Sequence, residues 1–402
     1  MPFSTPLLTK GAVFLSRTGI IAEFNPFHNG HAHIINEIKQ TGDHIVCALG
    51  GNFVQRGDLA VFSKYDRTKA ALKAGADLVC EIPSAYTMTT AQGFAMAGVW
   101  QLYNLGCDRI VFGSESGDIE LLSKTADILL SDKYSLEAAK LLKSGETFAK
   151  IRESAAKSCG ADISALRSPN DNLGTEYILA AKRMRLNIAF DTVKRAGTLH
   201  DADSAEKGFA SGSYIRDLIK KGDFEAAKAV TPDFVHPLLC REKAADISLI
   251  ERMILGILRT KSKDELALLP DVSEGIENRL YEAIKTATTL DGLYEAVKTK
   301  RYTLSRVRRL VLSAALGLDA SFFLTVPPYT RILGANSAGL SLLKNTLSLS
   351  PVISRGSDAE KLDERSKKLF LTECRAADLY ALAFDTPLPC GSEYTAKFIK
   401  AE

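Results

Sequence analysis

Short apolar segments alternate with helical patterns along the first half of the chain, and this alternation restricts the possible folds more than any other feature. Five segments have the β-branched, apolar character of buried strands: 19–24, 44–49, 77–82, 109–112 and 186–193. Helical patterns at 64–74 and 91–105 lie between successive strands. Strands and helices that alternate at this spacing predict right-handed crossovers and a parallel sheet, in which ligands bind beyond the carboxyl ends of the strands.

The pattern changes near residues 237–245, where we expect a domain boundary. From about Ile247 helical periodicity dominates, and the next segment with strand character is 322–326. We therefore predict three parts: an N-terminal extension over 1–18, a Rossmann-like α/β domain over 19–240 and a mainly α-helical domain over 241–402.

Composition excludes several classes of protein but does not indicate a particular function. Hydrophobic residues make up 46% of the chain and charged residues 25%, as in ordinary globular proteins. No apolar run reaches the roughly 18 residues that a membrane-spanning helix needs, so no membrane association is expected. The seven cysteines are scattered and form no Cys-x-x-Cys pair, which argues against a zinc ribbon or a disulfide framework. A soluble, cytoplasmic protein is therefore expected, and no protein-held metal site is predicted.

A histidine motif stands where the first strand turns into the first helix, and comprises Asn25, Pro26, Phe27, His28, Asn29, Gly30 and His31. A helix N-terminus offers free N–H groups and a positive dipole end, which suit a phosphate. Gly30 allows close approach of a ligand, and His28 and His31 can direct imidazole donors at the α-phosphate and the departing pyrophosphate. The alternative is that both histidines cap the helix or fill the core. The His-x-Gly-His spacing at such a turn favours phosphate chemistry, and it is not a zinc signature because no third ligand lies nearby.

A second element stands at 211–216, where Ser-Gly-Ser-Tyr-Ile-Arg precedes a helical pattern. Ser211 or Ser213 can cap the helix, while Arg216 and the exposed N–H groups can grip a triphosphate. Taken alone, this element is equally typical of an ordinary helix start. Paired with the histidine motif, it resembles the second signature of the nucleotidylyltransferase superfamily, and ATP is the expected ligand.

Further blocks narrow the resemblance to one family, the tRNA(Met) cytidine acetate ligases. The blocks are Glu-Phe-Asn-Pro-Phe-His-Asn-Gly-His at 23–31, Gly-Asn-Phe-Val-Gln-Arg-Gly at 51–57, Phe-Gly-Ser-Glu at 112–115, Ser-Pro-Asn at 168–170, Lys-Arg at 194–195, and Ser-Arg-Val-Arg-Arg at 305–309. The likeness extends from residue 19 to about residue 343.

The resemblance implies a two-step ligase that uses ATP with Mg²⁺ on its triphosphate. Acetate and ATP would give acetyl-adenylate and pyrophosphate. The N4 amine of the wobble cytidine in elongator tRNA(Met) would then take the acetyl group, which gives N4-acetylcytidine. No obligate protein partner is implied. The base that assists the amine stays open, and His200 with Asp201 is one option.

The resemblance also implies nucleotide contacts, which supplement the histidine motif, Ser213 and Arg216. They are Ile21, Ala22, Glu23, Gly113, Asn170 and Arg195. Asn172 is the alternative to Asn170, because the family carries Pro-Asn-Asn where this chain has Pro-Asn-Asp-Asn. Arg56 is a further candidate phosphate clamp, although it could simply order its own loop.

A basic window near residue 300 suits RNA. Four arginines in it are predicted to contact tRNA: Arg301, Arg306, Arg308 and Arg309. Cationic side chains beside an aromatic residue, here Tyr302, fit backbone contact and base stacking, although charge runs often form a solvated helix face. Two other functions stay open, namely a nucleotidylyltransferase for a small phosphorylated metabolite and a non-catalytic RNA-binding module with a relict nucleotide site.

Overall fold

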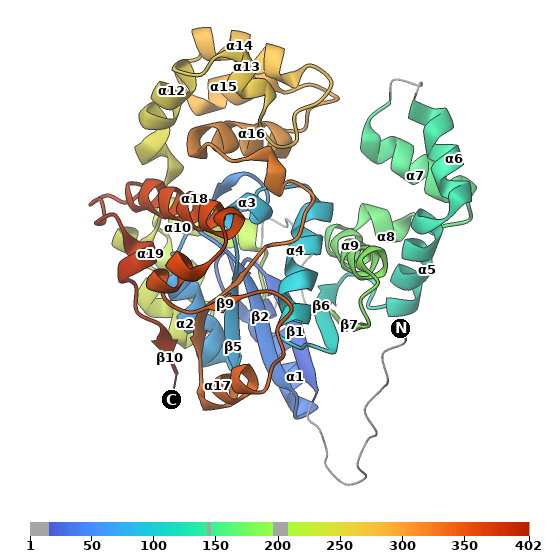
Figure 1. Ribbon diagram of the computed structural model, residues 1–402, viewed down its shortest axis with the longest axis vertical. Helices are drawn as coiled ribbons and strands as arrows, with labels where there is room; N and C mark the ends of the chain where they lie inside the picture. The colour runs from blue at the N-terminus through green and yellow to red at the C-terminus, as the bar shows by residue number, and fades with distance from the viewer. Residues whose placement is uncertain (1–15, 143–145, 196–207, 402) are drawn as a thin grey trace.

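The computed structural model describes residues 16–142, 146–195 and 208–401. Its central sheet has the strand order β10–β8–β5–β2–β1–β6–β7, and β9 also pairs with β8 (Figure 1). The strands are β1 (Arg17–Ala22), β2 (His44–Gly50), β5 (Leu78–Ile82), β6 (Arg109–Ser114), β7 (Ala189–Lys194), β8 (Thr330–Ala335), β9 (Val352–Ile353) and β10 (Ile399–Lys400). Strand pairs in this sheet are parallel, except that β5 and β8 run antiparallel. The predicted Rossmann-like parallel sheet is confirmed.

Helices cover both faces of the sheet: α1 (Asn29–Gln40) and α2 (Lys64–Ala74) lie on one, α4 (Ala91–Asn104) and α9 (Pro169–Met184) on the other. Successive side chains of a strand point to opposite faces, and β2 shows this directly. Its Ile45 and Cys47 pack with α1 and α2, whereas Val46 and Ala48 pack with α4 and α9. Both faces of β2 are thus buried, which explains the continuous apolar run in the sequence.

The connections between these elements contain further short structures. A two-stranded hairpin follows β2, a short helix follows β5, and a series of helices follows β6. The second signature begins a further helix, and another helix comes after it. They are β3 (Phe53–Val54), β4 (Asp58–Leu59), α3 (Ser84–Thr87), α5 (Ile119–Leu130), α6 (Asp132–Leu141), α7 (Phe148–Ser158), α8 (Ser164–Arg167), α10 (Gly212–Lys221) and α11 (Phe224–Lys228).

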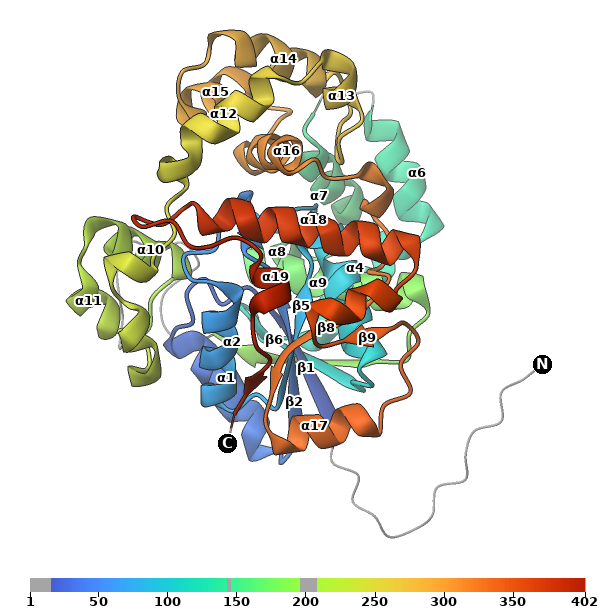
Figure 2. The same ribbon diagram turned by 60° about the vertical axis from the view of Figure 1, so that its left-hand side comes forward.

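A helical unit stands beyond the carboxyl ends of the strands, at the top of Figure 1. It consists of α12 (Glu251–Arg259), α13 (Lys263–Ala267), α14 (Ile276–Thr286), α15 (Leu290–Val297) and α16 (Leu304–Leu316). The remaining helices are α17 (Ser337–Lys344), α18 (Glu364–Ala381) and α19 (Ser392–Thr395). Figure 2 shows α18 running between this unit and the sheet.

The C-terminal part differs from the sequence prediction for 241–402. Three strands, β8, β9 and β10, return to the sheet of the α/β domain. The strand predicted at 322–326 is not formed there; the strand lies at Thr330–Ala335, and every residue of it is buried. At the other end, Arg17 and Thr18 belong to β1 rather than to an extension, and residues 1–15 lie outside the described residues. The division into domains stays a prediction. Residues 251–316 form the purely helical part of the predicted C-terminal domain.

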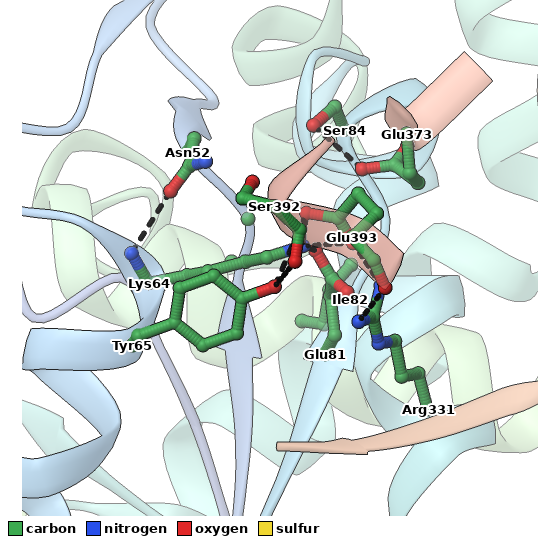
Figure 3. A network of polar contacts seen from close by, with 12 residues as sticks. Asn52, Lys64, Tyr65, Glu81, Ile82, Ser84, Arg331, Glu373, Ser392 and Glu393 are labelled. Carbon is green, nitrogen blue, oxygen red and sulfur yellow. Dashed lines mark hydrogen bonds and ion pairs between the residues drawn. The ribbon is translucent and has the colours of Figure 1, made fainter. Parts of the chain in front are cut away.

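A buried charge cluster holds the C-terminal segment against the sheet (Figure 3). Lys64 Nζ of α2 contacts Glu81 Oε1 of β5 at 2.5 Å and Glu393 Oε1 of α19 at 2.8 Å, and all three side chains are at most 2% exposed. Arg331 of β8 forms an ion pair with the same Glu393. Beside them, Glu373 of α18 accepts a hydrogen bond from Ser84 Oγ at 2.9 Å. Five elements, α2, β5, β8, α18 and α19, therefore contribute side chains to one buried set of acidic and basic groups.

Among the described residues, no helix combines the length and the apolar character needed to cross a membrane.

Candidate active site

A cavity of about 520 Å³ opens at the carboxyl ends of β1 and β6. Most of the predicted nucleotide contacts line it: Ile21, Ala22, Glu23, Asn25, His28, His31, Gly113, Asn170, Arg195, Ser213 and Arg216. Asn172 and Arg56, the two further candidates, line it as well. The structure thus brings together residues from β1, α1, β6, α9 and α10 that lie far apart in the sequence.

The other residues of the histidine motif build the turn rather than the cavity wall. Phe27 is buried, and its ring packs against Phe234 at a centroid distance of 5.7 Å. Asn29 donates to the Gly208 carbonyl at 2.8 Å. Pro26 follows Asn25 in a cis peptide bond. Gly30 lines a smaller neighbouring pocket together with both histidines.

The two histidines cap the helix and face the cavity at the same time. His28 is the N-cap of α1, and its Nδ1 accepts the N–H of Gly30 at 3.1 Å. His31 Nδ1 accepts the N–H of His28 at 3.3 Å, and the rings stack with centroids 3.7 Å apart. A ring whose Nδ1 accepts is neutral and carries its proton on Nε2. Capping therefore fixes the tautomer that leaves both Nε2–H groups as donors for a ligand.

The electrostatic surroundings keep these rings neutral. Burial, aided by the cations of Arg195 and Arg216, lowers the pKa of His28 to about 3. Burial likewise lowers the pKa of His31 well below its usual value, with contributions from His28 and Arg195. Bound polyanion would oppose this effect, because a nearby negative charge favours the protonated ring. The free site therefore offers two neutral donors beside fixed positive charge.

Gly30 has a local structural reason in addition to the predicted close approach of a ligand. A Cβ at this position would lie 2.9 Å from His28 Cε1 and 3.1 Å from His28 Nδ1. The glycine thus makes room for the imidazole that folds back to cap the helix.

The turn before α1 is held by long-range contacts. Phe24 adopts φ of 47°, a left-handed conformation that non-glycine residues take only when their surroundings impose it. Asn25 Oδ1 accepts the Val61 N–H at 2.8 Å, and its carbonyl accepts Arg216 Nη1 at 2.7 Å. The second signature therefore contacts the first directly. A Cβ at Gly212 would lie 3.2 Å from both the Asn25 carbonyl oxygen and Arg216 Nη1, which explains the glycine between Ser211 and Ser213.

The end of β6 and the start of α9 clamp each other. Glu115 accepts Asn170 Nδ2 at 2.6 Å, and its Oε2 accepts the Asp171 N–H at 2.9 Å. In return, Asp171 accepts the N–H groups of Glu115 and Ser116, each at 3.1 Å. This clamp sets Asn170 on the cavity wall, and it shows why the Phe-Gly-Ser-Glu and Ser-Pro-Asn blocks occur together.

Arg67 of α2 is a structural residue that the sequence analysis missed. Its buried guanidinium donates to the backbone carbonyls of Phe62 at 2.9 Å, Glu23 at 2.5 Å and Gly50 at 3.0 Å, and also to that of Gly51. Burial lowers its pKa to about 10. Arg67 thus ties the ends of β1 and β2 to the loop before α2. No local pattern marks it, because its partners are main-chain atoms of distant residues.

The four arginines of the basic window have different surroundings in the structure. Arg301 is exposed, whereas Arg306 and Arg309 form ion pairs with Asp271 at 3.6 and 3.2 Å. Arg309 is buried, so it does not lie on a surface shared with Arg301. Arg308 lines the cavity instead. The RNA contacts stay predictions, and of the four arginines Arg308 is the one that lines the described cavity. The His200 and Asp201 alternative for the base lies outside the described residues.

Fold and site define a nucleotide-binding enzyme of the HIGH type, and the comparisons agree. The sequence profile of the HIGH Nucleotidyl Transferase family matches residues 15–392. A tRNA(Met) cytidine acetate ligase from Thermoanaerobacter sp. (strain X514) is 37% identical over 398 residues, which cover 95% of this chain and 99% of the relative. The ligase from Caldanaerobacter subterraneus subsp. tengcongensis is 38% identical over 381 residues, covering 91% and 95%.

Solved structures give the same result. The crystal structure of Thermotoga maritima TmcAL in its apo form I superposes with a TM-score of 0.90 at 28% identity, and covers 96% of this chain and 99% of that one. The same protein bound with alpha-thio ATP gives 0.87 at 29% identity, with the same coverage. The chain belongs to the HIGH nucleotidyl transferase family and, within it, to the tRNA(Met) cytidine acetate ligases. The family predicted from the sequence blocks is confirmed.

Proposed function

We propose that this protein activates acetate with ATP and transfers the acetyl group to N4 of the wobble cytidine in elongator tRNA(Met). The observation that carries the proposal is the neutral His28–His31 pair at the N-terminus of α1, with Arg195 and Arg216 on the same cavity. The names of the relatives and the alpha-thio ATP in the Thermotoga maritima structure support it. A cytoplasmic location is expected, because tRNA is the acceptor.

The first step needs positioning and charge stabilisation rather than a covalent intermediate on the protein. An acetate oxygen attacks the α-phosphorus of ATP, the bond to the β-phosphate oxygen breaks, and pyrophosphate leaves. Negative charge grows on the phosphate oxygens. The two imidazole Nε2–H donors and the N-terminus of α1 would stabilise this charge. Four arginines line the described cavity (Arg56, Arg195, Arg216 and Arg308) against two carboxyl groups (Glu23 and Asp58), which favours a polyanion.

Magnesium is proposed to enter on the triphosphate. Mg²⁺ commonly binds through substrate phosphates and keeps several waters, so it does not require a dedicated protein cage. Within the described residues, no group of three or more His, Cys, Asp or Glu side chains could hold a metal ion. Magnesium would shield the triphosphate and help pyrophosphate to leave, while the residues above orient the α-phosphate.

The proposed tRNA contact lies on the helical unit next to the cavity. Lys298, Lys300 and Arg301 are exposed just before α16, and α16 itself reaches the cavity through Arg308. Charge in such a place attracts the phosphate backbone without reading sequence.

The test is to incubate the protein with ATP, Mg²⁺, radiolabelled acetate and total tRNA, and to identify the labelled nucleoside after digestion. Label in N4-acetylcytidine from tRNA(Met) is expected, together with AMP and pyrophosphate. His28→Ala should lose most of it, whereas His33→Ala, on the same helix, should keep it. Turnover of ATP without label in tRNA would refute the acceptor assignment and favour a small-metabolite nucleotidylyltransferase.

A further inference from the structure

The cavity has a second wall that carries none of the nucleotide contacts predicted from the first two signatures. The β3–β4 hairpin and α16 build it, and Asp58 and Arg308 line the cavity from these elements. The two elements touch through their backbones. Gly57 has φ of +76°, and a Cβ there would lie only 2.5 Å from the Arg309 backbone nitrogen. This contact holds Asp58 and Arg308 beside the nucleotide site, at the place where the helical unit meets the α/β domain.

Both side chains have polar atoms suited to a ligand. The Asp58 carboxylate accepts the Leu59 N–H at 2.8 Å. Arg308 lies over the Tyr294 ring, 5.4 Å from its centroid. Its buried Nε and the buried Tyr294 hydroxyl find no hydrogen-bond partner within the described part of the chain. Buried polar groups are normally paired, so the unpaired Nε of Arg308, a residue of the cavity wall, leaves a donor that a polar ligand can engage.

Asp58 differs from the other carboxyl group in the cavity. Glu23 stands at the end of β1, next to the histidine turn. One oxygen of each carboxyl group accepts a backbone N–H, Glu23 Oε1 from Gln55 at 2.6 Å and Asp58 Oδ1 from Leu59 at 2.8 Å, so position rather than hydrogen bonding separates the two groups. Asp58 stands on the wall built by the β3–β4 hairpin and α16, to which the histidine motif and the second signature contribute no residue. Burial raises the pKa of the Asp58 carboxyl, while the cations of Arg308 and Arg216 act in the opposite direction. The net effect raises the pKa of the Asp58 carboxyl above its ordinary value, which makes the carboxylate a better proton acceptor.

We propose that Asp58 is the general base of the acetyl-transfer step and that Arg308 is the residue that positions it. Carboxylates are natural acceptors for the N4 amino group of cytosine. The N4 lone pair attacks the acetyl carbonyl carbon of acetyl-adenylate, and a C–N bond forms. The bond between that carbon and the phosphate oxygen breaks, and AMP leaves with the electron pair. One N4 proton passes to the Asp58 carboxylate and then to solvent. This inference rests on the proposed function, because it needs the cytosine acceptor.

The experiment separates the two half-reactions in Asp58→Asn. Acetate-dependent exchange of labelled pyrophosphate into ATP reports activation, and single-turnover transfer of labelled acetyl to tRNA(Met) reports the second step. Asp58→Asn should keep exchange within about threefold of wild type and lose transfer by roughly 10²–10⁴-fold, the usual contribution of a general base. The control is Asp127→Asn, which makes the same chemical change at an exposed ion pair with Lys182. It should match wild type in both assays.

Arg308 gives an independent readout through pH. The charged or titratable groups that act on Asp58 are Arg308, Arg216, Asp246 and Tyr294. Removing the Arg308 cation disfavours the ionised carboxylate, so Arg308→Gln should move the acid limb of the transfer rate to higher pH, and Arg308→Lys should restore much of it. Asp58→Asn should lack that limb.

Each outcome is decisive. Equal loss of exchange and transfer in Asp58→Asn, or transfer that persists near wild-type rates, would overturn the assignment. Wild-type protein that exchanges pyrophosphate but never labels tRNA would refute the proposed function instead, and so the two failures are distinguishable.

Discussion

Replacing Lys64 by methionine should destabilise the protein by about 4 kcal/mol at pH 7. The Lys64 ammonium lies between the carboxylates of Glu81 and Glu393, and Arg331 is the other cation of the cluster. Methionine keeps most of the side-chain volume but leaves two buried carboxylates against one cation. Breaking a buried ion pair in this way typically costs about 3–5 kcal/mol.

A second route gives a similar magnitude. The folded variant can restore the charge balance of the cluster if one of its carboxylates takes up a proton that the unfolded chain would release. At pH 7, protonating a carboxyl group of ordinary pKa, about 4.3, costs roughly 1.36 × 2.7, or about 3.7 kcal/mol. At pH 5 the same step costs about 1 kcal/mol. The loss of stability in Lys64→Met should therefore shrink by about 3 kcal/mol between pH 7 and pH 5.

The assay is urea unfolding followed by circular dichroism at both pH values. Adding Glu81→Gln to Lys64→Met should recover most of the loss, because it removes the surplus charge. Lys69→Met is the matched control, since Lys69 is 57% exposed in its pair with Asp66 and such pairs contribute less than about 1 kcal/mol. A loss below about 1 kcal/mol at pH 7, or one that does not change with pH, would refute the reasoning.

Two further predictions concern stability. Gly174→Ala should cost roughly 1–3 kcal/mol in the same assay, because the new methyl group would lie 2.1 Å from Phe112 Cε2; an unchanged unfolding midpoint would contradict this packing. Burial, aided by Glu81, raises the pKa of Glu373 to about 7, so the folded state holds a proton that the unfolded state releases near 4.5. Wild-type stability should therefore fall by about 3 kcal/mol as the pH rises through this window, and Glu373→Gln should flatten the curve; a parallel curve in the variant would count against it.

Local signals in the sequence predicted much of the α/β domain. The bounds of α2 agree with the predicted 64–74, because Ser63 caps its start and Gly75, with φ of 112°, ends it. The histidine motif could likewise be placed at a strand-to-helix turn from its neighbours alone. Such features depend on a few adjacent residues, which is why a sequence pattern can reveal them.

Features that depend on distant partners were not predictable in this way. β8 pairs with β5, a strand about 250 residues earlier in the chain. No repeating strand–helix alternation surrounds β8, so the sequence pattern did not reveal its place in the sheet. The charge run near residue 300 showed four arginines but not Asp271, with which Arg306 and Arg309 form ion pairs. Asp58 and Arg308 lie far apart in the sequence and line one cavity because the hairpin packs closely on α16 at Gly57.

Chemistry at the α-phosphate is the central claim, and isotope transfer from acetate tests it most directly. The protein would be incubated with ATP, Mg²⁺, tRNA and acetate labelled with ¹⁸O in both oxygens, and the nucleotide products analysed by mass spectrometry. Attack by acetate on the α-phosphorus predicts AMP that carries one ¹⁸O atom, and pyrophosphate without label. Label in inorganic phosphate with ADP as product would instead place the attack at the γ-phosphate and contradict the account.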